Sequence, residues 1–352
     1  MKQIILNEIS YGSNIFIYGN GYGGKIYYEV IKFLRKDLNL FFIDDNNSSI
    51  KLETLKIDEN FYILNSIITK DIREKVNKKI ADFNFQDRLI SIKGIDEFIL
   101  NESVPFFHLI SEEYYMKNLE NIEYICKNLS YESSKLYKEL LYYRLLNKEN
   151  KKRLLNGYYF EPFSNNTDEK QYLEFIPNNS IETILEAGVY DGESSVKLLN
   201  YYKAKRLYGF KPFKEKFLKY NDDRMKIIKK GLWDKETVLY FNENGSSSKI
   251  SSNGIEIETI TIDEFCKYKK IDLIKMDIEG AEFNAIKGGM KTIKRDRPFL
   301  AISIYHSIDD FVLLTKYIIQ NLENYQFEIG VYSEYLHEII LYALPIEKLK
   351  GK

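Results

Sequence analysis

The segment Ile184-Leu185-Glu186-Ala187-Gly188-Val189-Tyr190-Asp191-Gly192-Glu193 decides how the second half of this chain is expected to fold. The apolar run that ends at Leu185 predicts a short buried strand, and the glycines at 188 and 192 predict a tight turn. A helix over about residues 193–201 follows. Strand, glycine-rich turn and helix in this order open an α/β sheet in which ligands bind at the carboxyl ends of the strands.

The charges around this turn indicate which ligand it binds. Glu186 and Asp191 place carboxylates beside Gly188 and Gly192, where the backbone approaches a ligand closely. Carboxylates suit a cation and repel a diphosphate. S-adenosylmethionine carries an ammonium and a sulfonium group and no phosphate, so on charge alone it fits this turn better than NAD.

The rest of the second half alternates strands and helices. Strands are predicted at 206–210, 225–228, 271–276 and 299–304, helices at 213–220 and from Asp277 onward, and a β insertion at 237–241 and 254–262. This alternation predicts a parallel, doubly wound sheet.

The first hundred residues predict a smaller unit of the same kind. The motif Gly19-x-Gly21-x-x-Gly24 follows an apolar run and precedes a helical pattern, and Asp44 ends the next apolar run. This context is typical of nucleotide binding, with a helix N-terminus facing a phosphate and Asp44 accepting a hydrogen bond from a ribose hydroxyl. The alternative is a degenerate nucleotide fold that serves packing or assembly.

A helical segment joins the two units. Residues 110–156 lack glycine and proline and carry Tyr, Leu and Ile at helical spacing, which predicts helices over 112–128 and 133–155. We therefore divide the chain into a Rossmann-like N-terminal domain (1–105), a helical connector (106–156) and a second α/β domain (157–352).

The composition excludes several classes of protein. The chain has 51 Lys and Arg against 52 Asp and Glu, so no global field attracts nucleic acid or an anionic membrane. Cys126 and Cys266 are too few for a disulfide framework or a cysteine zinc site. No apolar stretch approaches the roughly 20 residues of a membrane span, and the N-terminal apolar run is too short for a signal peptide. We expect a cytoplasmic protein with no nucleic-acid partner, whose surface leaves room for a homodimer.

Five ordered blocks of the second half resemble the FkbM-type methyltransferases. They are residues 184–194, 209–213, 231–234, 261–265 leading into 272–282, and 304–306 with Asp309 and Asp310. The segment Lys275-x-Asp277-x-Glu279-Gly280-Ala281-Glu282 is the most specific of them, and the resemblance covers about residues 157–345. It implies a class I methyltransferase fold, S-adenosylmethionine as methyl donor, and a hydroxyl of a sugar or another natural product as acceptor. The N-terminal unit is similar to ones that handle nucleotide sugars.

The resemblance also implies roles for single residues. The expected contacts of S-adenosylmethionine are Tyr172, Glu186, Gly188, Asp191, Gly192, Lys211, Trp233 and Asp234. At position 211 the family has an acid that binds both ribose hydroxyls, and each such charge-assisted hydrogen bond is worth about 1.5–3 kcal/mol. Lys211 cannot accept these bonds.

Lys211 therefore supports a rival interpretation, in which the chain is a non-catalytic methyltransferase-like protein that binds a nucleotide sugar or scaffolds a glycan-modifying complex. A third interpretation is an NAD-linked enzyme that uses the glycines of the N-terminal turn and Asp44. The leading prediction is an S-adenosylmethionine-dependent O-methyltransferase of polysaccharide biosynthesis, with a sugar or nucleotide-sugar acceptor.

Methyl transfer to a hydroxyl needs in-line attack and removal of a proton. His306, at the end of a predicted strand, is the expected base, and Asp277 and Glu279 share the predicted catalytic site. Asp277, Glu279 and Glu282 crowd one predicted helix start, where they orient the sugar or offer oxygen ligands to a divalent cation. A metal site at Asp277 and Glu282 is left open, since acids there also stabilise a helix dipole. His337 with Glu338 is a further candidate lining of the acceptor side.

Overall fold

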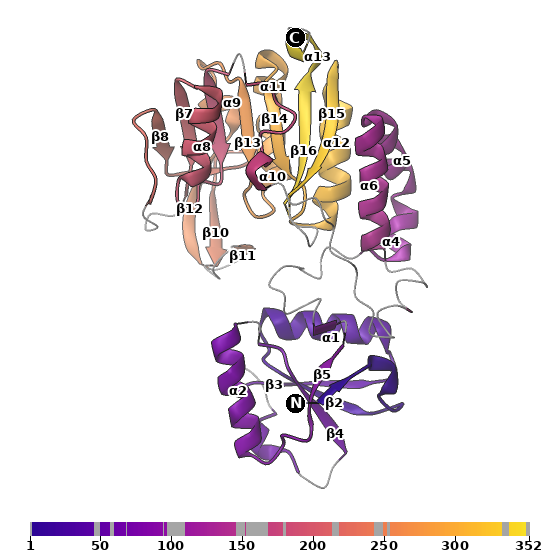
Figure 1. Ribbon diagram of the computed structural model, residues 1–352. Helices are drawn as coiled ribbons and strands as arrows, with labels where there is room; N and C mark the ends of the chain where they lie inside the picture. Colours follow the sequence, from indigo (N-terminus) through magenta and orange to yellow (C-terminus); the bar gives the residue numbers. More distant parts are fainter. Residues whose placement is uncertain are drawn as a thin grey trace. The chain divides into compact units, whose positions relative to one another are not determined.

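The computed structural model describes residues 2–45, 50–56, 60–67, 69–93, 95–96, 110–145, 152, 168–178, 181–212, 218–242, 249–251, 254–332 and 338–349. The chain forms two compact units, one of Met1–Glu112 with Tyr143–Pro162 and the other of Glu113–Tyr142 with Phe163–Lys352 (Figure 1). The predicted boundaries at 105/106 and 156/157 lie outside the described residues and stay predictions.

The first unit contains a five-stranded parallel sheet. Its order is β1 (Lys2–Ile4), β5 (Leu89–Ile92), β4 (Phe61–Asn65), β2 (Asn14–Tyr18) and β3 (Asn39–Ile43). Side chains of β2 alternate between two cores: Ile15 and Ile17 pack with α1 (Tyr22–Leu34), whereas Phe16 packs with Ile80 of α2 (Lys70–Asp82). The two helices therefore cover opposite faces of the sheet, and the predicted succession of strand, glycine-rich turn, helix and strand is present.

The second unit is built on a seven-stranded sheet. Its order is β15 (Tyr325–Val331), β16 (Ile339–Pro345), β14 (Phe299–Ser303), β13 (Leu273–Met276), β6 (Thr183–Ala187), β7 (Arg206–Phe210) and β8 (Met225–Ile228). Neighbouring strands are parallel except at β16, which is antiparallel to both β14 and β15. The predicted α/β sheet is confirmed, whereas the reversed strand was not predicted, because a buried apolar run looks the same in either direction.

Helices and a smaller sheet complete this unit. The helices are α8 (Glu193–Tyr202), α9 (Ile262–Phe265), α10 (Glu282–Lys287), α11 (Met290–Asp296), the π-helix η5 (Asp310–Leu314), α12 (Thr315–Asn321) and α13 (Ile346–Leu349). The predicted β insertion forms a four-stranded sheet in the order β11 (Lys249–Ser251), β10 (Val238–Asn242), β12 (Ile255–Ile260) and β9 (Gly231–Leu232). Of the predicted helix at 213–220, residues 213–217 lie outside the described part, and residues 218–220 are not helical.

The predicted connector supplies three helices, α4 (Glu112–Lys117), α5 (Leu119–Asn128) and α6 (Tyr131–Arg144). The continuous helix expected over 112–128 is interrupted at Asn118, whose backbone is not helical and whose amide donates to Tyr114 O (3.0 Å). Helices α5 and α12 lie side by side (Figure 1). Ser133 donates to the buried Glu328 of β15, and Ser133 Oγ accepts from Ile329 N (2.8 Å). Apart from Glu112, Tyr143 and Arg144, these helices therefore belong to the second unit.

Strand register brings the candidate residues to one edge of the large sheet. Ala187 at the end of β6 pairs with Met276 of β13 and with Phe210 of β7. The residues that follow these strand ends therefore meet. The chain leaves β6 toward β7 and returns to β13 on the other side of β6, which makes this edge the topological switch point.

Candidate functional site

The link between β13 and α10 carries the acids of the site. Glu279 (φ 57°) and Gly280 (φ 93°) adopt left-handed conformations, which cannot continue a right-handed helix. The chain therefore turns after Asp277, and α10 begins only at Glu282. The prediction of a helix that opens at Asp277 was wrong, so stabilisation of the helix dipole applies to Glu282 alone.

Glu282 holds this turn in place. Its carboxylate is fully buried and accepts hydrogen bonds from Ile278 N (2.6 Å) and Gly280 N (2.9 Å). One of its oxygens also lies 3.1 Å from His306 Nδ1. Glu282 thus fixes both the acidic turn and one side of the imidazole.

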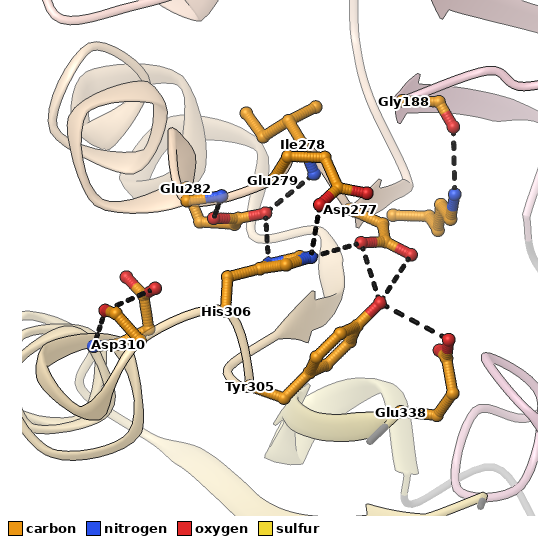
Figure 2. A network of polar contacts seen from close by, with 12 residues as sticks. Gly188, Asp277, Ile278, Glu279, Glu282, Tyr305, His306, Asp310 and Glu338 are labelled. Atoms are coloured by element: carbon orange, nitrogen blue, oxygen red, sulfur yellow. Dashed lines mark hydrogen bonds and ion pairs between the residues drawn. The ribbon is translucent and has the colours of Figure 1, made fainter. Parts of the chain in front are cut away.

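His306 follows β14, and its ring lies among three carboxylates (Figure 2). Nδ1 faces Glu282, whereas Nε2 lies 3.2 Å from Asp277 Oδ1 and 3.7 Å from Glu279 Oε2. The side chain is only 8% exposed, yet neither nitrogen makes a directed hydrogen bond within the described part of the chain. The contacts are therefore ion pairs whose oxygens lie off the N–H directions.

These charges decide the protonation of His306. Burial by itself would lower the pKa of His306, but the charges of Glu282 and Asp277 outweigh it and raise that pKa well above its usual value. An imidazolium has no free lone pair with which to accept a substrate proton. The role of His306 as a base stays a prediction.

Two tyrosines and a further glutamate extend the cluster. Tyr172 OH donates to Asp277 Oδ2 (2.9 Å), and Tyr305 OH contacts Asp277 Oδ1 (3.2 Å) and Glu338 Oε1 (3.3 Å). Burial raises the pKa of Glu338 to about 7, and the charge of Asp277 adds to the rise. The sequence analysis did not predict a role for Tyr305, although this residue precedes His306 in the block of residues 304–306. His337, predicted beside Glu338, lies outside the described residues.

Glu186 is fully partnered in the interior. It lies 3.2 Å from Lys275 Nζ and accepts hydrogen bonds from Ser194 (2.6 Å) and Ser195. Both charged side chains are almost completely buried, with exposures of 4% for Lys275 and 0% for Glu186. Glu186 therefore links β6, α8 and β13, and its predicted contact with a cofactor stays a prediction.

The glycine-rich turn of the second unit touches the acidic turn directly. Gly188 has φ 90°, and a Cβ there would lie 1.7 Å from Asp277 O. Gly192 has φ 95°, and a Cβ there would lie 2.1 Å from Tyr220 O. Both positions require glycine, while Asp191 Oδ1 accepts from Glu193 N (3.1 Å) at the start of α8.

Lys211 lies at the end of β7 and is buried, with 8% exposure. Its ammonium donates hydrogen bonds to the carbonyl oxygens of Val189 (3.1 Å) and Tyr190. It therefore braces the glycine-rich turn from the position where the resemblance expects an acid. Trp233 and Asp234 follow β9, where Trp233 N donates to Ile260 O (3.1 Å). Their predicted cofactor contacts are not tested by this placement.

The N-terminal motif forms a compact turn of its own. Gly19 has φ 102°, and a Cβ at Gly24 would lie 1.8 Å from Gly19 O. Asp44 Oδ2 accepts a hydrogen bond from Asn20 N (2.9 Å), so this carboxylate faces the turn. At Gly21 an added Cβ would meet nothing within 4 Å, which leaves the backbone open to close approach. Nucleotide binding by these residues stays a prediction.

None of the helices in the described ranges combines the length and the apolar character that a membrane span requires. The cytoplasmic location expected from the sequence stays a prediction.

Comparison with known proteins supplies the family. A profile of the methyltransferase FkbM domain matches residues 137–329. The crystal structure of methyltransferase FkbM from Methylobacillus flagellatus KT has 16% sequence identity and a TM-score of 0.55, with 95% of this chain and 90% of that chain covered. This likeness shows a shared fold.

A second solved structure, the SAH-bound methyltransferase PaMTH1 of Podospora anserina, has 11% identity and a TM-score of 0.26, covering 46% of this chain and 71% of that chain. No curated protein matches the chain. Because the FkbM profile spans more than half of the 352 residues, the chain belongs to the FkbM family of methyltransferases.

Proposed function

We propose that this methyltransferase transfers a methyl group from S-adenosylmethionine to a hydroxyl of a sugar or glycan precursor, such as a nucleotide sugar of polysaccharide biosynthesis. The observation that carries the proposal is the contact between the two turns at the switch point. Gly188 approaches Asp277 O so closely that no side chain fits between them. A donor bound at the Gly188–Gly192 turn is thereby adjacent to the cluster of Asp277, Glu279 and His306.

The chemistry of the cluster suits a hydroxyl-bearing acceptor. Asp277 and Glu279 carry 20% and 48% exposed side chains, so their oxygens are within reach of an incoming molecule. Carboxylates accept hydrogen bonds from sugar hydroxyls, and positioning supplies most of the rate in a direct in-line transfer. In this proposal the cluster of His306, Asp277 and Glu279 binds the acceptor hydroxyl, and a carboxylate of the cluster takes up its proton.

Calorimetry with S-adenosylhomocysteine tests the donor half of this proposal. We expect saturable binding, and we expect labelled methyl groups to pass from S-adenosylmethionine to sugar or nucleotide-sugar acceptors. Asp277→Asn should lower methyl transfer more than donor binding, because Asp277 lies on the acceptor side of the contact. The absence of both heat and thermal shift at millimolar S-adenosylhomocysteine would overturn the proposal.

Lys211 supports one alternative, a non-catalytic member of the family that binds a nucleotide sugar or scaffolds a glycan-modifying complex. Its buried ammonium holds the turn at the point where the family has an acid for the ribose. Parallel titrations with S-adenosylhomocysteine, NAD and a nucleotide sugar discriminate the candidates. Binding of the nucleotide sugar alone would favour the alternative, and binding of NAD alone would favour the NAD-linked enzyme.

A further inference from the structure

We propose that the second unit binds a divalent cation between His306 Nε2, Asp277 Oδ1 and Glu279 Oε2. The three atoms come from two segments that meet at the sheet edge, the turn after β13 and the segment that follows β14 (Figure 2). This ligand set differs from the pair Asp277 and Glu282 that the sequence left open.

The distances from His306 Nε2 to the two carboxylate oxygens are close to those of ligands that share an ion. Bonds from a divalent metal to imidazole nitrogen or carboxylate oxygen are about 2.0–2.2 Å long, which places neighbouring ligands about 3.0–3.5 Å apart in tetrahedral or octahedral sites. Nε2 lies 3.2 Å from Asp277 Oδ1 and 3.7 Å from Glu279 Oε2. Small side-chain adjustments bring the second distance into range.

The imidazole of His306 is buried, and within the described part of the chain no directed hydrogen bond occupies its Nε2. Only 8% of the side chain is exposed. Both carboxylate oxygens lie near Nε2, so a cation bound to Nε2 would have Asp277 Oδ1 and Glu279 Oε2 close by.

Glu282 serves as the supporting carboxylate. It faces the opposite nitrogen, Nδ1, at 3.1 Å, and its own oxygens are held by the amides of Ile278 and Gly280. A histidine that binds a metal through one nitrogen commonly has a fixed carboxylate at the other. Glu282 Oε1 faces Nδ1, and both Glu282 oxygens accept backbone hydrogen bonds, so we assign Glu282 the role of orienting His306, although one of its oxygens also lies within 4.8 Å of ligand atoms of Asp277 and His306.

The charge balance favours a doubly charged partner. Three carboxylates, those of Asp277, Glu279 and Glu282, surround one imidazole. The nearby ammonium of Lys275 is paired with Glu186 at 3.2 Å. Uncompensated negative charge in a mostly buried cluster is costly, and a divalent cation offsets more of it than a single proton on His306.

Mixed nitrogen and oxygen ligation suits first-row divalent ions, for which Mn²⁺ is a convenient probe. The role of the cation in catalysis rests on the proposed function: the cation would hold the acceptor hydroxyl and lower the pKa of that hydroxyl. Binding of the cation does not depend on the proposed function.

The test is an electron paramagnetic resonance titration of the full chain with Mn²⁺ after treatment with a chelator. We expect one saturable site per chain. Asp277→Asn and Glu279→Gln, which keep the side-chain shapes, should each weaken Mn²⁺ binding at least tenfold. The control Glu236→Gln, at an exposed acid of the insertion, should bind as the parent protein does. Circular dichroism and melting temperature verify that each variant is folded.

Absence of a saturable site in the folded parent protein would overturn the proposal, as would equal Mn²⁺ affinity in the parent, Asp277→Asn and Glu279→Gln. Methyl transfer is measured separately, with Mn²⁺ and with chelator. Mn²⁺ binding without any methyl transfer would retain the cation site and reject the proposed function. Methyl transfer that persists in chelator, without Mn²⁺ binding, would retain the proposed function and reject the cation site.

Discussion

At the scale of single residues, Lys211 cannot make the ribose contacts expected at its position but stabilises the glycine-rich turn instead. A lysine cannot accept hydrogen bonds from ribose hydroxyls. In the structure its ammonium donates to the carbonyls of Val189 and Tyr190, and thereby holds the turn that the donor is proposed to occupy. Lys211 thus stabilises the backbone of the glycine-rich turn, independently of its effect on the affinity for the methyl donor.

We expect Lys211→Met to lower the free energy of unfolding by about 1–3 kcal/mol, because two carbonyls lose a buried, charged donor while the aliphatic packing remains. Binding of S-adenosylhomocysteine should weaken at the same time. Urea denaturation and calorimetry measure both effects. Lys205→Met is a suitable control, since Lys205 pairs with Glu182 on the surface with 73% of its side chain exposed.

Lys211→Glu distinguishes the two interpretations of this position. It would place a carboxylate beside two carbonyl oxygens, so we expect a larger loss of stability than for Lys211→Met and no gain in affinity. Tighter binding of S-adenosylhomocysteine at unchanged stability would contradict this expectation. It would mean that the lysine acts mainly by depriving the ribose of an acid.

At the scale of elements, the strand-turn-helix unit of the N-terminal sheet offers a matched pair of glycines. We expect Gly24→Ala to lower the melting temperature of the first unit, because a Cβ there would lie 1.8 Å from Gly19 O and would force α1 away from β2. Gly21→Ala should leave the melting temperature nearly unchanged, since a Cβ at Gly21 meets nothing within 4 Å. Differential scanning calorimetry compares the two variants.

The same turn tests the predicted nucleotide site. Gly21→Val should preserve the fold, and a bulky side chain at this open position would block the close approach of a phosphate. We expect the variant to lose binding of a nucleotide sugar or NAD that the parent protein shows in the same titration. Unchanged binding by Gly21→Val would mean that the ligand does not approach this turn.

At the scale of the whole molecule, the two compact units have separate cores. Ile15 and Tyr27 belong to a core of the first unit, and Ile184 and Leu207 to the core of the second. We expect scanning calorimetry to resolve two unfolding transitions. S-adenosylhomocysteine should stabilise only the second unit. At a ligand concentration of 100 times Kd, the free energy of unfolding of that unit should rise by about 2.7 kcal/mol. A single transition, or an equal shift of both, would contradict independent unfolding.

The sequence by itself determined the order of part of both α/β sheets, namely β2, α1 and β3 in the first and β6, α8, β7, β8, β13 and β14 in the second. Alternating apolar runs and glycine-rich turns depend on local spacing, so β6, α8 and β7 appear where they were expected. The motifs of the second half, and the resemblance that they carry, were sufficient to indicate the family, because each motif lies within one contiguous stretch of sequence. They could not place the start of α10, since the left-handed backbone of Glu279 depends on the buried carboxylate of Glu282 that holds the turn.

Only the tertiary structure decided which side chains meet. Sequence spacing contains no information on the partners of Glu186, whose carboxylate pairs with Lys275 from a strand almost ninety residues away. The same holds for Lys211, which braces the turn after β6, and for His306, whose nitrogens face acids of the β13–α10 link. These contacts arise because parallel strands place their carboxyl ends at one edge, so that residues distant in the chain share a site whose charges and hydrogen bonds are set by packing.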